Sequence, residues 1–187
     1  MASAFGLSGA AGVNAYLPLL VVSLTARYTN LITLNEPFDL MTSGWVIGAL
    51  TALLLVESVA DKVPAVDHIN DIIQGVLRPI AGAILFAAAS GTVGDVHPVL
   101  AMVAGLLMAG SVHAVKATAR PVVTATTGGT GNWLVSLLED IWSFVTAVLA
   151  ILMPLLAVVF IASGVVMLVI ILRHYRPRKQ YAGNCPR

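Results

Sequence analysis

Four of the nine acidic side chains of this chain lie within one short segment, ESVADKVPAVDHIND at positions 57–71. They are Glu57, Asp61, Asp67 and Asp71. The first two are four residues apart, and so are the last two, so each pair of carboxylates lies on one face of a helix. Pro64 interrupts the chain between the pairs, and Asp67 could cap a second helix that begins near it. We therefore expect two helix ends that face each other with paired carboxylates.

A second group of ionisable side chains occurs later in the chain. His113 and Lys116 lie near the end of one apolar segment, and Glu139 and Asp140 lie about two turns into the next. Carboxylates that converge with a histidine could bind a hard or borderline divalent cation. They could equally relay protons, because burial raises the pKa of a carboxyl group. The candidate metal ligands are Glu57, Asp61, Glu139 and Asp140.

A purely structural role for these charges is the alternative. In that interpretation Glu57 pairs with Lys116 and Asp71 pairs with Arg78, and the pairs lock the helices together. Ionisable groups inside membrane spans are costly, and this cost makes them functional candidates. Three basic residues would balance the carboxylates: Lys62, Arg78 and Lys116.

The composition predicts a membrane protein. Of the 187 residues, 58% are hydrophobic and only 10% are charged, and the mean hydropathy is +0.93. Soluble domains are about 45–50% apolar and about 25% charged. The net charge of +1 gives no indication of nucleic-acid binding. The single cysteine, Cys185, forms no intramolecular disulfide, and no catalytic motif is present, so neither an enzyme nor a cofactor beyond a bound cation is expected.

Six segments are apolar enough to be membrane helices. A span needs about 20 residues, and the run from 133 to 172 is long enough for two, with Pro154 as the natural point of reversal. The predicted fold is an all-α integral membrane protein, a six-helix transmembrane bundle. The predicted spans are 3–26, 43–60, 72–90, 98–115, 133–153 and 155–172.

The basic residues predict the orientation of these spans. Six spans place nine of the ten lysines and arginines on one side and only Arg27 on the other, so both termini should be cytoplasmic. We expect a single transmembrane domain over 1–172 and a basic cytoplasmic tail over 173–187. Asp140–Ile141 echoes Asp71–Ile72, and each pair precedes a proline. The halves 1–92 and 97–172 could therefore be two inverted three-helix repeats.

The segments ESVADKVPAVDHIND, RPIAG and NWLVSLLED, followed by the proline-broken apolar run, resemble a family of small bacterial membrane proteins, the domain of unknown function numbered 4126. The resemblance covers about Gly6 to Leu172 and implies a helical membrane fold without a specific activity. Its most specific residues are Glu57, Asp61, Lys62, Pro64, Asp67, Asp71, Arg78, Pro79, Ser136, Glu139 and Asp140.

A looser likeness connects the chain to cation/proton exchangers with the motif Glu-x-Gly-Asp-Lys. Here the segment from Glu57 to Lys62 has one extra residue and no glycine, and the second half lacks the lysine. This likeness implies cation exchange through the carboxylates.

The expected function is membrane transport. A transporter or channel for a small ion or solute, such as a divalent cation/proton exchanger, would use the carboxylate cluster with His113 as a proton-handling group. The expected location is the bacterial inner membrane, with the lipid bilayer as the main partner. The alternative is a structural or accessory subunit of a larger membrane complex or homo-oligomer, because glycine- and alanine-rich helix faces pack closely.

Overall fold

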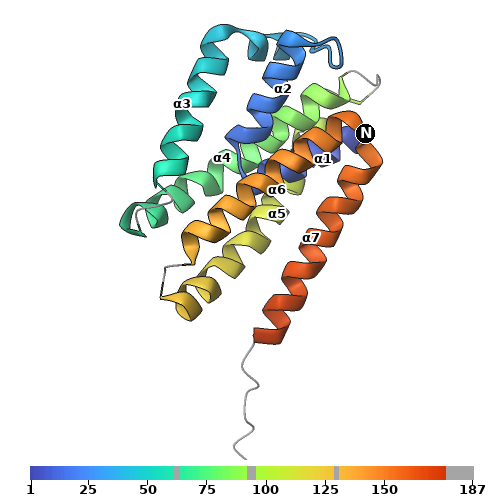
Figure 1. The fold of residues 1–187 in the computed structure, drawn as a ribbon. Helices are drawn as coiled ribbons and strands as arrows, with labels where there is room; N and C mark the ends of the chain where they lie inside the picture. Colours follow the sequence, from blue (N-terminus) through green and yellow to red (C-terminus); the bar gives the residue numbers. More distant parts are fainter. Residues whose placement is uncertain (61–63, 92–95, 129–130, 176–187) are drawn as a thin grey trace, which may run out of the picture.

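The computed structural model describes the backbone of residues 1–60, 64–91, 96–128 and 131–175. Within these ranges the protein is all-helical (Figure 1). The elements are α1 (Ala2–Val13), α2 (Tyr16–Tyr28), the 3₁₀ helix η1 (Phe38–Thr42), α3 (Gly44–Ala60), α4 (Pro64–Ser90), α5 (Pro98–Thr127), α6 (Asn132–Leu152) and α7 (Pro154–Tyr175).

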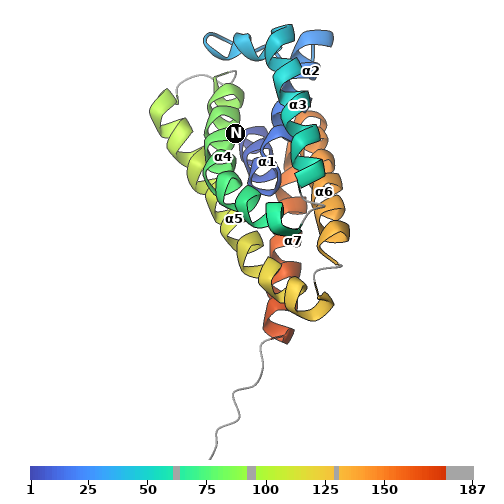
Figure 2. The ribbon, with the colours of Figure 1, turned by 90° about the vertical axis from the view of Figure 1, so that its left-hand side faces the viewer.

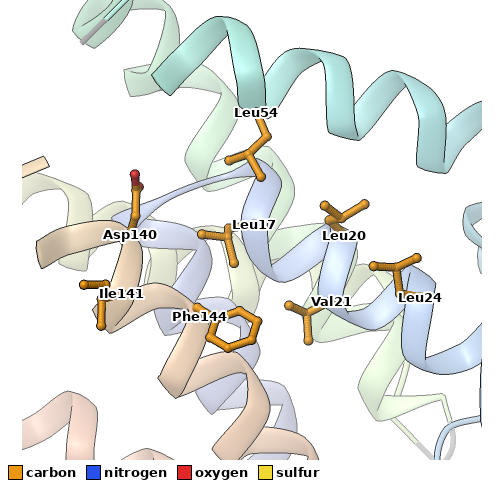
Figure 3. A pocket seen from close by; sticks show the side chains of 8 residues that line it. All are labelled: Leu17, Leu20, Val21, Leu24, Leu54, Asp140, Ile141 and Phe144. Carbon is orange, nitrogen blue, oxygen red and sulfur yellow. The ribbon is translucent and has the colours of Figure 1, made fainter. Parts of the chain in front are cut away.

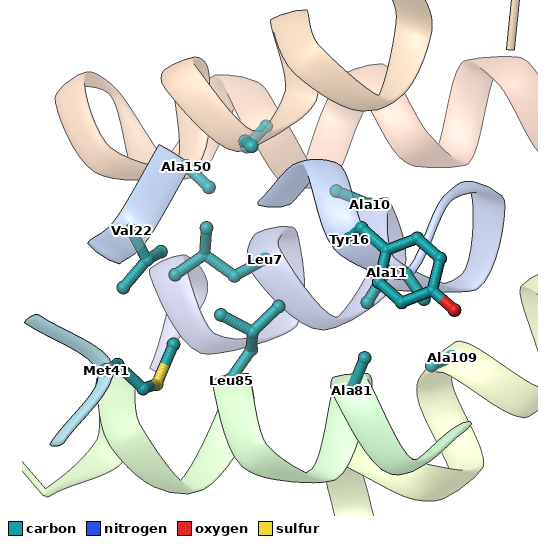
Figure 4. Close-up of a cluster of buried hydrophobic side chains, with 13 residues drawn as sticks. Leu7, Ala10, Ala11, Tyr16, Val22, Met41, Ala81, Leu85, Ala109 and Ala150 are labelled. Atoms are coloured by element: carbon teal, nitrogen blue, oxygen red, sulfur yellow. The ribbon is translucent and has the colours of Figure 1, made fainter. Parts of the chain in front are cut away.

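The first predicted span is a hairpin of two helices. Helix α1 ends at Val13, and α2 turns back along it, so that Val22 lies beside Leu7 in the core (Figure 4). In one continuous helix these two residues would be about 22 Å apart. With 12 residues, α1 is about 18 Å long and too short to cross a hydrocarbon core of about 30 Å. The prediction of a single span over 3–26 is therefore wrong.

Helix α1 is the centre of the bundle. It contacts α4, α5, α6 and α7, and most of its residues are buried. Its glycines and alanines permit this close approach, because they add little volume between the backbones. Ser8 lies among them and donates a hydrogen bond to the Gly105 carbonyl of α5 at 2.7 Å. The core around α1 is thus built from small side chains and a few larger ones such as Leu85 (Figure 4).

The other predicted helices agree with the structure apart from their ends. Met153 separates α6 from α7, and α7 begins at Pro154, which confirms the predicted reversal. Helix α4 begins at Pro64, three residues before the predicted start, because proline is well tolerated in the first turn of a helix. Gly128 ends α5 with a φ of 60°, a left-handed conformation that suits glycine.

The two described ends of the chain lie at opposite ends of the bundle. Ala4 packs with Phe86 and Ala101, near the connection between α4 and α5. Helix α7 ends at the other extreme (Figures 1 and 2). The expectation that both termini share a side differs from this arrangement, because it treated the hairpin as one crossing. The hairpin also has no counterpart in α5, α6 and α7, so the described structure does not support two inverted three-helix repeats.

Three helices are long and apolar enough to cross a membrane: Ile72–Ser90, Pro98–Ala125 and Asn132–Leu152. Shorter apolar helices accompany them: Ala2–Val13, Gly44–Ala60 and Pro154–Met167. Large apolar side chains such as Leu107 and Leu155 are more than half exposed on the outer surface. This surface is costly in water and suits lipid, which indicates a membrane protein.

We expect Gly105→Ala to destabilise the bundle, because the added methyl group would meet the Gly82 carbonyl oxygen and, at 2.6 Å, the Phe86 Cβ. Overpacking of this kind costs about 1–3 kcal/mol. Gly48→Ala is the matched control, since nothing lies within 4 Å of the added atom. Thermal unfolding of the purified variants should show a lower midpoint for Gly105→Ala alone, and equal midpoints would contradict the close packing of α4 and α5.

Candidate functional site

Buried or partly buried ionisable side chains from four helices lie around the tip of the α1–α2 hairpin. Glu57 comes from α3, Arg78 from α4, Lys116 from α5 and Glu139 from α6. Burial of charge in an apolar bundle is costly unless each charge is paired. The structure meets this requirement with two ion pairs.

The first ion pair joins α3 to α4. Arg78 Nη2 lies 3.6 Å from Glu57 Oε1, and the two side chains are only 1% and 4% exposed. Arg78 Nη1 also lies 3.0 Å from Nδ1 of His113 on α5. Because a guanidinium group can only donate, Nδ1 of His113 is the acceptor. Arg78 therefore connects three helices, and Glu57 is the buried residue of α3.

The second ion pair joins α5 to α6 and to the hairpin. Lys116 Nζ lies 2.8 Å from Glu139 Oε2 and donates to the Val13 carbonyl at 2.9 Å. Val13 is the last residue of α1, where the carbonyl groups lack partners within the helix. A cation at this position also interacts favourably with the negative end of the helix dipole. Lys116 thus stabilises the broken end of α1.

Asn14 occupies the turn of the hairpin and is 2% exposed. Its side-chain oxygen accepts hydrogen bonds from the backbone N–H groups of Tyr16 and Leu17, at 3.0 and 3.1 Å. Its Nδ2 donates to Asp140 Oδ1 on α6 at 2.9 Å. Asn14 therefore caps α2 and attaches the tip of the hairpin to α6.

The structure brings the predicted site residues into pairs that differ from the expected ones. Glu57 pairs with Arg78 rather than Lys116, and Lys116 pairs with Glu139. The expectation was wrong because spacing along the chain does not encode which helices are neighbours, and Lys116 lies between the end of α1 and α6. Asn132 is the first residue of α6, and its Oδ1 accepts a hydrogen bond from Thr124 Oγ1.

Part of the predicted carboxylate cluster cannot be placed. Asp61 and Lys62 lie outside the described residues, and the side chains of Asp67 and Asp71 do so as well. In the part of the chain that is described, no group of three or more histidine, cysteine, aspartate or glutamate residues could hold a metal ion. Glu57, Glu139 and Asp140 instead contact Arg78, Lys116 and Asn14 respectively.

Two residues that the sequence did not single out contribute to the site. Gln74 lies one turn before Arg78 on α4 and is 1% exposed, and Tyr16 begins α2 and interacts with Glu57 and Arg78. The signal for Gln74 was its polar side chain within the apolar run over 72–90, at a spacing of four from Arg78. Tyr16 had no such signal, because only the reversal of α2 brings it to this position.

An apolar groove lies next to the hairpin, between α2, α3 and α6 (Figure 3). It has a volume of about 410 Å³. The carboxyl group of Asp140 lies at its border, close to Leu17 (Figure 3). The lining residues are Leu17, Leu20, Val21, Leu24, Leu54, Asp140, Ile141 and Phe144. The groove therefore has an apolar lining, which suits lipid, and it ends at the polar tip of the hairpin.

We expect Asn14→Asp to destabilise the protein, because a second carboxylate would face Asp140 and the donated hydrogen bond would be lost. The exchange variant Asn14→Asp/Asp140→Asn keeps a capping oxygen and one amide donor, so it should recover much of the loss. Unfolding midpoints of the two single variants and the exchange variant measure this coupling. Additive losses would show that the two side chains do not interact.

Glu57→Gln should lower the free energy of unfolding by about 3–5 kcal/mol, because it leaves a buried arginine without its counter-charge. The double variant Glu57→Gln/Arg78→Gln removes both charges and should be more stable than Glu57→Gln alone. The comparison is a double-mutant cycle on thermal or denaturant unfolding. A double variant less stable than either single variant would contradict the ion pair.

Comparison with known proteins gives one result about the family. A family model, described as a domain of unknown function (DUF4126), matches residues 1–174. No curated protein and no solved structure matches the chain. The likeness to cation/proton exchangers therefore has no support from these comparisons. Because the match extends over all the described helices except the last residue of α7, the chain belongs to the DUF4126 family.

Proposed function

We propose that this protein is a membrane transporter or channel for a small ion or solute. One observation carries the proposal: a helix breaks inside the bundle, and its broken end lies among buried ionisable side chains. Discontinuous helices of this kind form the substrate and ion sites of many transporters. Buried ionisable groups in a membrane protein are also functional candidates, because their burial is costly.

The hairpin supplies backbone groups that an intact helix would not. Backbone that leaves the helical ladder inside a membrane is tolerated only where it is buried in protein or borders a water-filled cavity. Here the Val13 carbonyl faces Lys116, and the first N–H groups of α2 face Asn14. Exchange of these partners for a substrate would need no change in secondary structure.

If a transport pathway passes the hairpin, the ion pairs would keep it closed in this structure, because they join the helices around it. Glu57 and Arg78 are almost fully buried, and Lys116 holds Glu139 and the end of α1 together. A substrate that enters would have to compete with these contacts. Coupling to protons or divalent cations would require Glu57 or Glu139 to leave its basic partner. The proposal is therefore not restricted to these ions and includes any small ion or solute.

We further propose a topology in the bacterial inner membrane. Helices α3 to α7 would cross the bilayer, and α1 and α2 would enter and leave it from the same side. The ends of α5 and α7 that carry Lys116, Arg120 and Arg173 then share the cytoplasmic side. The N-terminus would lie on the opposite side.

A structural subunit is the second candidate function. The observation in its favour is that both ion pairs are already formed, since Glu57 and Glu139 each have a basic partner. In this case the cluster would fix the helix positions, and the exposed apolar faces would contact lipid or other subunits. The two candidates differ in whether the isolated protein moves a solute.

Flux into proteoliposomes tests the proposal. We expect purified protein to conduct at least one member of a panel of protons, divalent cations, monovalent ions and small uncharged solutes. Glu139→Gln keeps a side chain that accepts from Lys116 but removes the charge, so it should reduce this flux by about tenfold or more, the equivalent of about 1.4 kcal/mol.

Thr51→Val is a suitable control, because its hydroxyl is exposed and bonds only to the Ile47 carbonyl of its own helix in the described structure. It should retain the flux of the wild type. Absence of flux for every member of the panel, with protein that is folded and correctly inserted, would reject transport and favour the structural subunit.

A further inference from the structure

Two oxygen atoms from different helices converge on one cationic group beside the break in the first helix. The ammonium group of Lys116 lies 2.8 Å from Oε2 of Glu139 on α6 and donates a hydrogen bond to the Val13 carbonyl of α1 at 2.9 Å. The side chains of Lys116 and Glu139 are only 9% and 17% exposed. A positive charge therefore lies inside the protein, between a carboxylate and a helix end.

The break in the helix makes the Val13 carbonyl available to this charge. In a continuous helix the carbonyl groups of Gly12 and Val13 would accept from the N–H groups four residues later, those of Tyr16 and Leu17. Those two N–H groups donate to the side-chain oxygen of Asn14 instead, at 3.0 and 3.1 Å. The last carbonyl groups of α1 thus lie at the negative end of the helix dipole without their helical donors.

Oxygen atoms of these two kinds are suitable ligands for a cation. Hard cations prefer carboxylate and carbonyl oxygens. In transporters with discontinuous helices, unwound carbonyl groups and the C-terminal ends of half-helices coordinate the transported cation. The end of α1 offers the carbonyl of Val13, and α6 adds the carboxylate of Glu139. The ammonium group of Lys116 occupies the point that these two oxygens share.

The charge of the lysine restricts the cation that could take its place. The interior accommodates one positive charge at this point, whatever further contacts Lys116 and Glu139 make. A monovalent cation at the same point leaves the total charge unchanged, whereas a divalent cation adds a charge in a medium of low dielectric constant. The site therefore favours a monovalent cation over a divalent one.

The position of the ammonium group also provides the space for the cation. Lysine carries a compact charge on a flexible four-carbon stem, so this group can turn away without a change in the backbone. A cation and Lys116 would then compete for the same two oxygens. Because the exchange costs the contacts of Lys116 with Val13 and Glu139, we expect the wild type to bind the cation more weakly than a variant without the ammonium group.

We propose that the Val13 carbonyl and the Glu139 carboxylate form a site for a monovalent metal cation, and that the ammonium group of Lys116 holds this site in the structure. The inference rests on the proposed transport function and names its substrate class. Lys116 would act as a tethered competitor, which leaves the two oxygens when the cation enters and returns to them when it departs.

The first experiment measures unfolding of the purified full-length protein. Lys116→Met keeps the stem of the side chain and removes little more than the nitrogen atom, so a cation can take the place of the ammonium group. Sodium or potassium chloride should raise the unfolding midpoint of this variant by about 3–6 °C relative to choline chloride at equal ionic strength, the shift for a cation at about ten times its Kd. The wild type should show a smaller difference between these salts.

Lys116→Met/Glu139→Gln is the matched control, because it also removes the carboxylate. Its midpoint should be the same in all three salts. An equal response of the single and the double variant would overturn the site, since the ions would then act elsewhere. The site would also be overturned if the double variant folds and Lys116→Met does not fold in any of the salts.

The second experiment measures flux into proteoliposomes that contain the wild type, and it decides the question if neither variant folds. Sodium, potassium, calcium, magnesium and acetamide are tested in separate arms. We expect flux of sodium or potassium, reduced about tenfold by Glu139→Gln. Flux restricted to divalent cations or to acetamide would overturn this inference and leave transport intact.

Failure of the broader proposal would give a different result. Absence of flux in every arm would reject transport, and with it the assignment of monovalent cations as substrates. The response of Lys116→Met to sodium and potassium does not depend on transport, so it would still show whether the end of α1 and Glu139 bind a monovalent cation.

Discussion

The break in the first helix at Asn14 is the feature on which the rest of the structure depends. A helix that ends inside an apolar bundle exposes carbonyl groups at one end and N–H groups at the start of the next helix. Bulk water does not reach the interior of an apolar bundle, so side chains must satisfy these groups. Lys116 and Asn14 do this, and their own charge or polarity then requires Glu139 and Asp140.

The small residues of α1 make that arrangement possible. Glycine and alanine allow four other helices to approach α1 closely. Gly82 of α4 and Gly105 of α5 likewise allow α4 and α5 to approach each other. Without this close approach the side chains of Lys116 and Asp140 would not reach the hairpin. Packing and polar chemistry are therefore linked, because the same short helix supplies both the contact surface and the unsatisfied backbone.

The ion pair between Glu57 and Arg78 has a different role. Most of α3 is exposed on the surface of the bundle, and Glu57 is its buried residue. A leucine at this position would pack in the interior without the cost of desolvating a charge. The pair therefore specifies how α3 sits against α4.

The sequence alone determined that the protein is helical and apolar, where most of its helices lie, and which ionisable residues are candidates. Long apolar runs and a proline in the run over 133–172 are local signals, and the reversal at Pro154 follows from them. Only the tertiary structure decided that residues 3–26 form a hairpin, because α1 and α2 are both apolar and the break is a single buried asparagine. That reversal also brought the Val13 carbonyl beside Lys116 and Tyr16 beside Gln74. Such pairings depend on which helix faces reach the interior together, and periodicity along one chain does not encode the distances between helices.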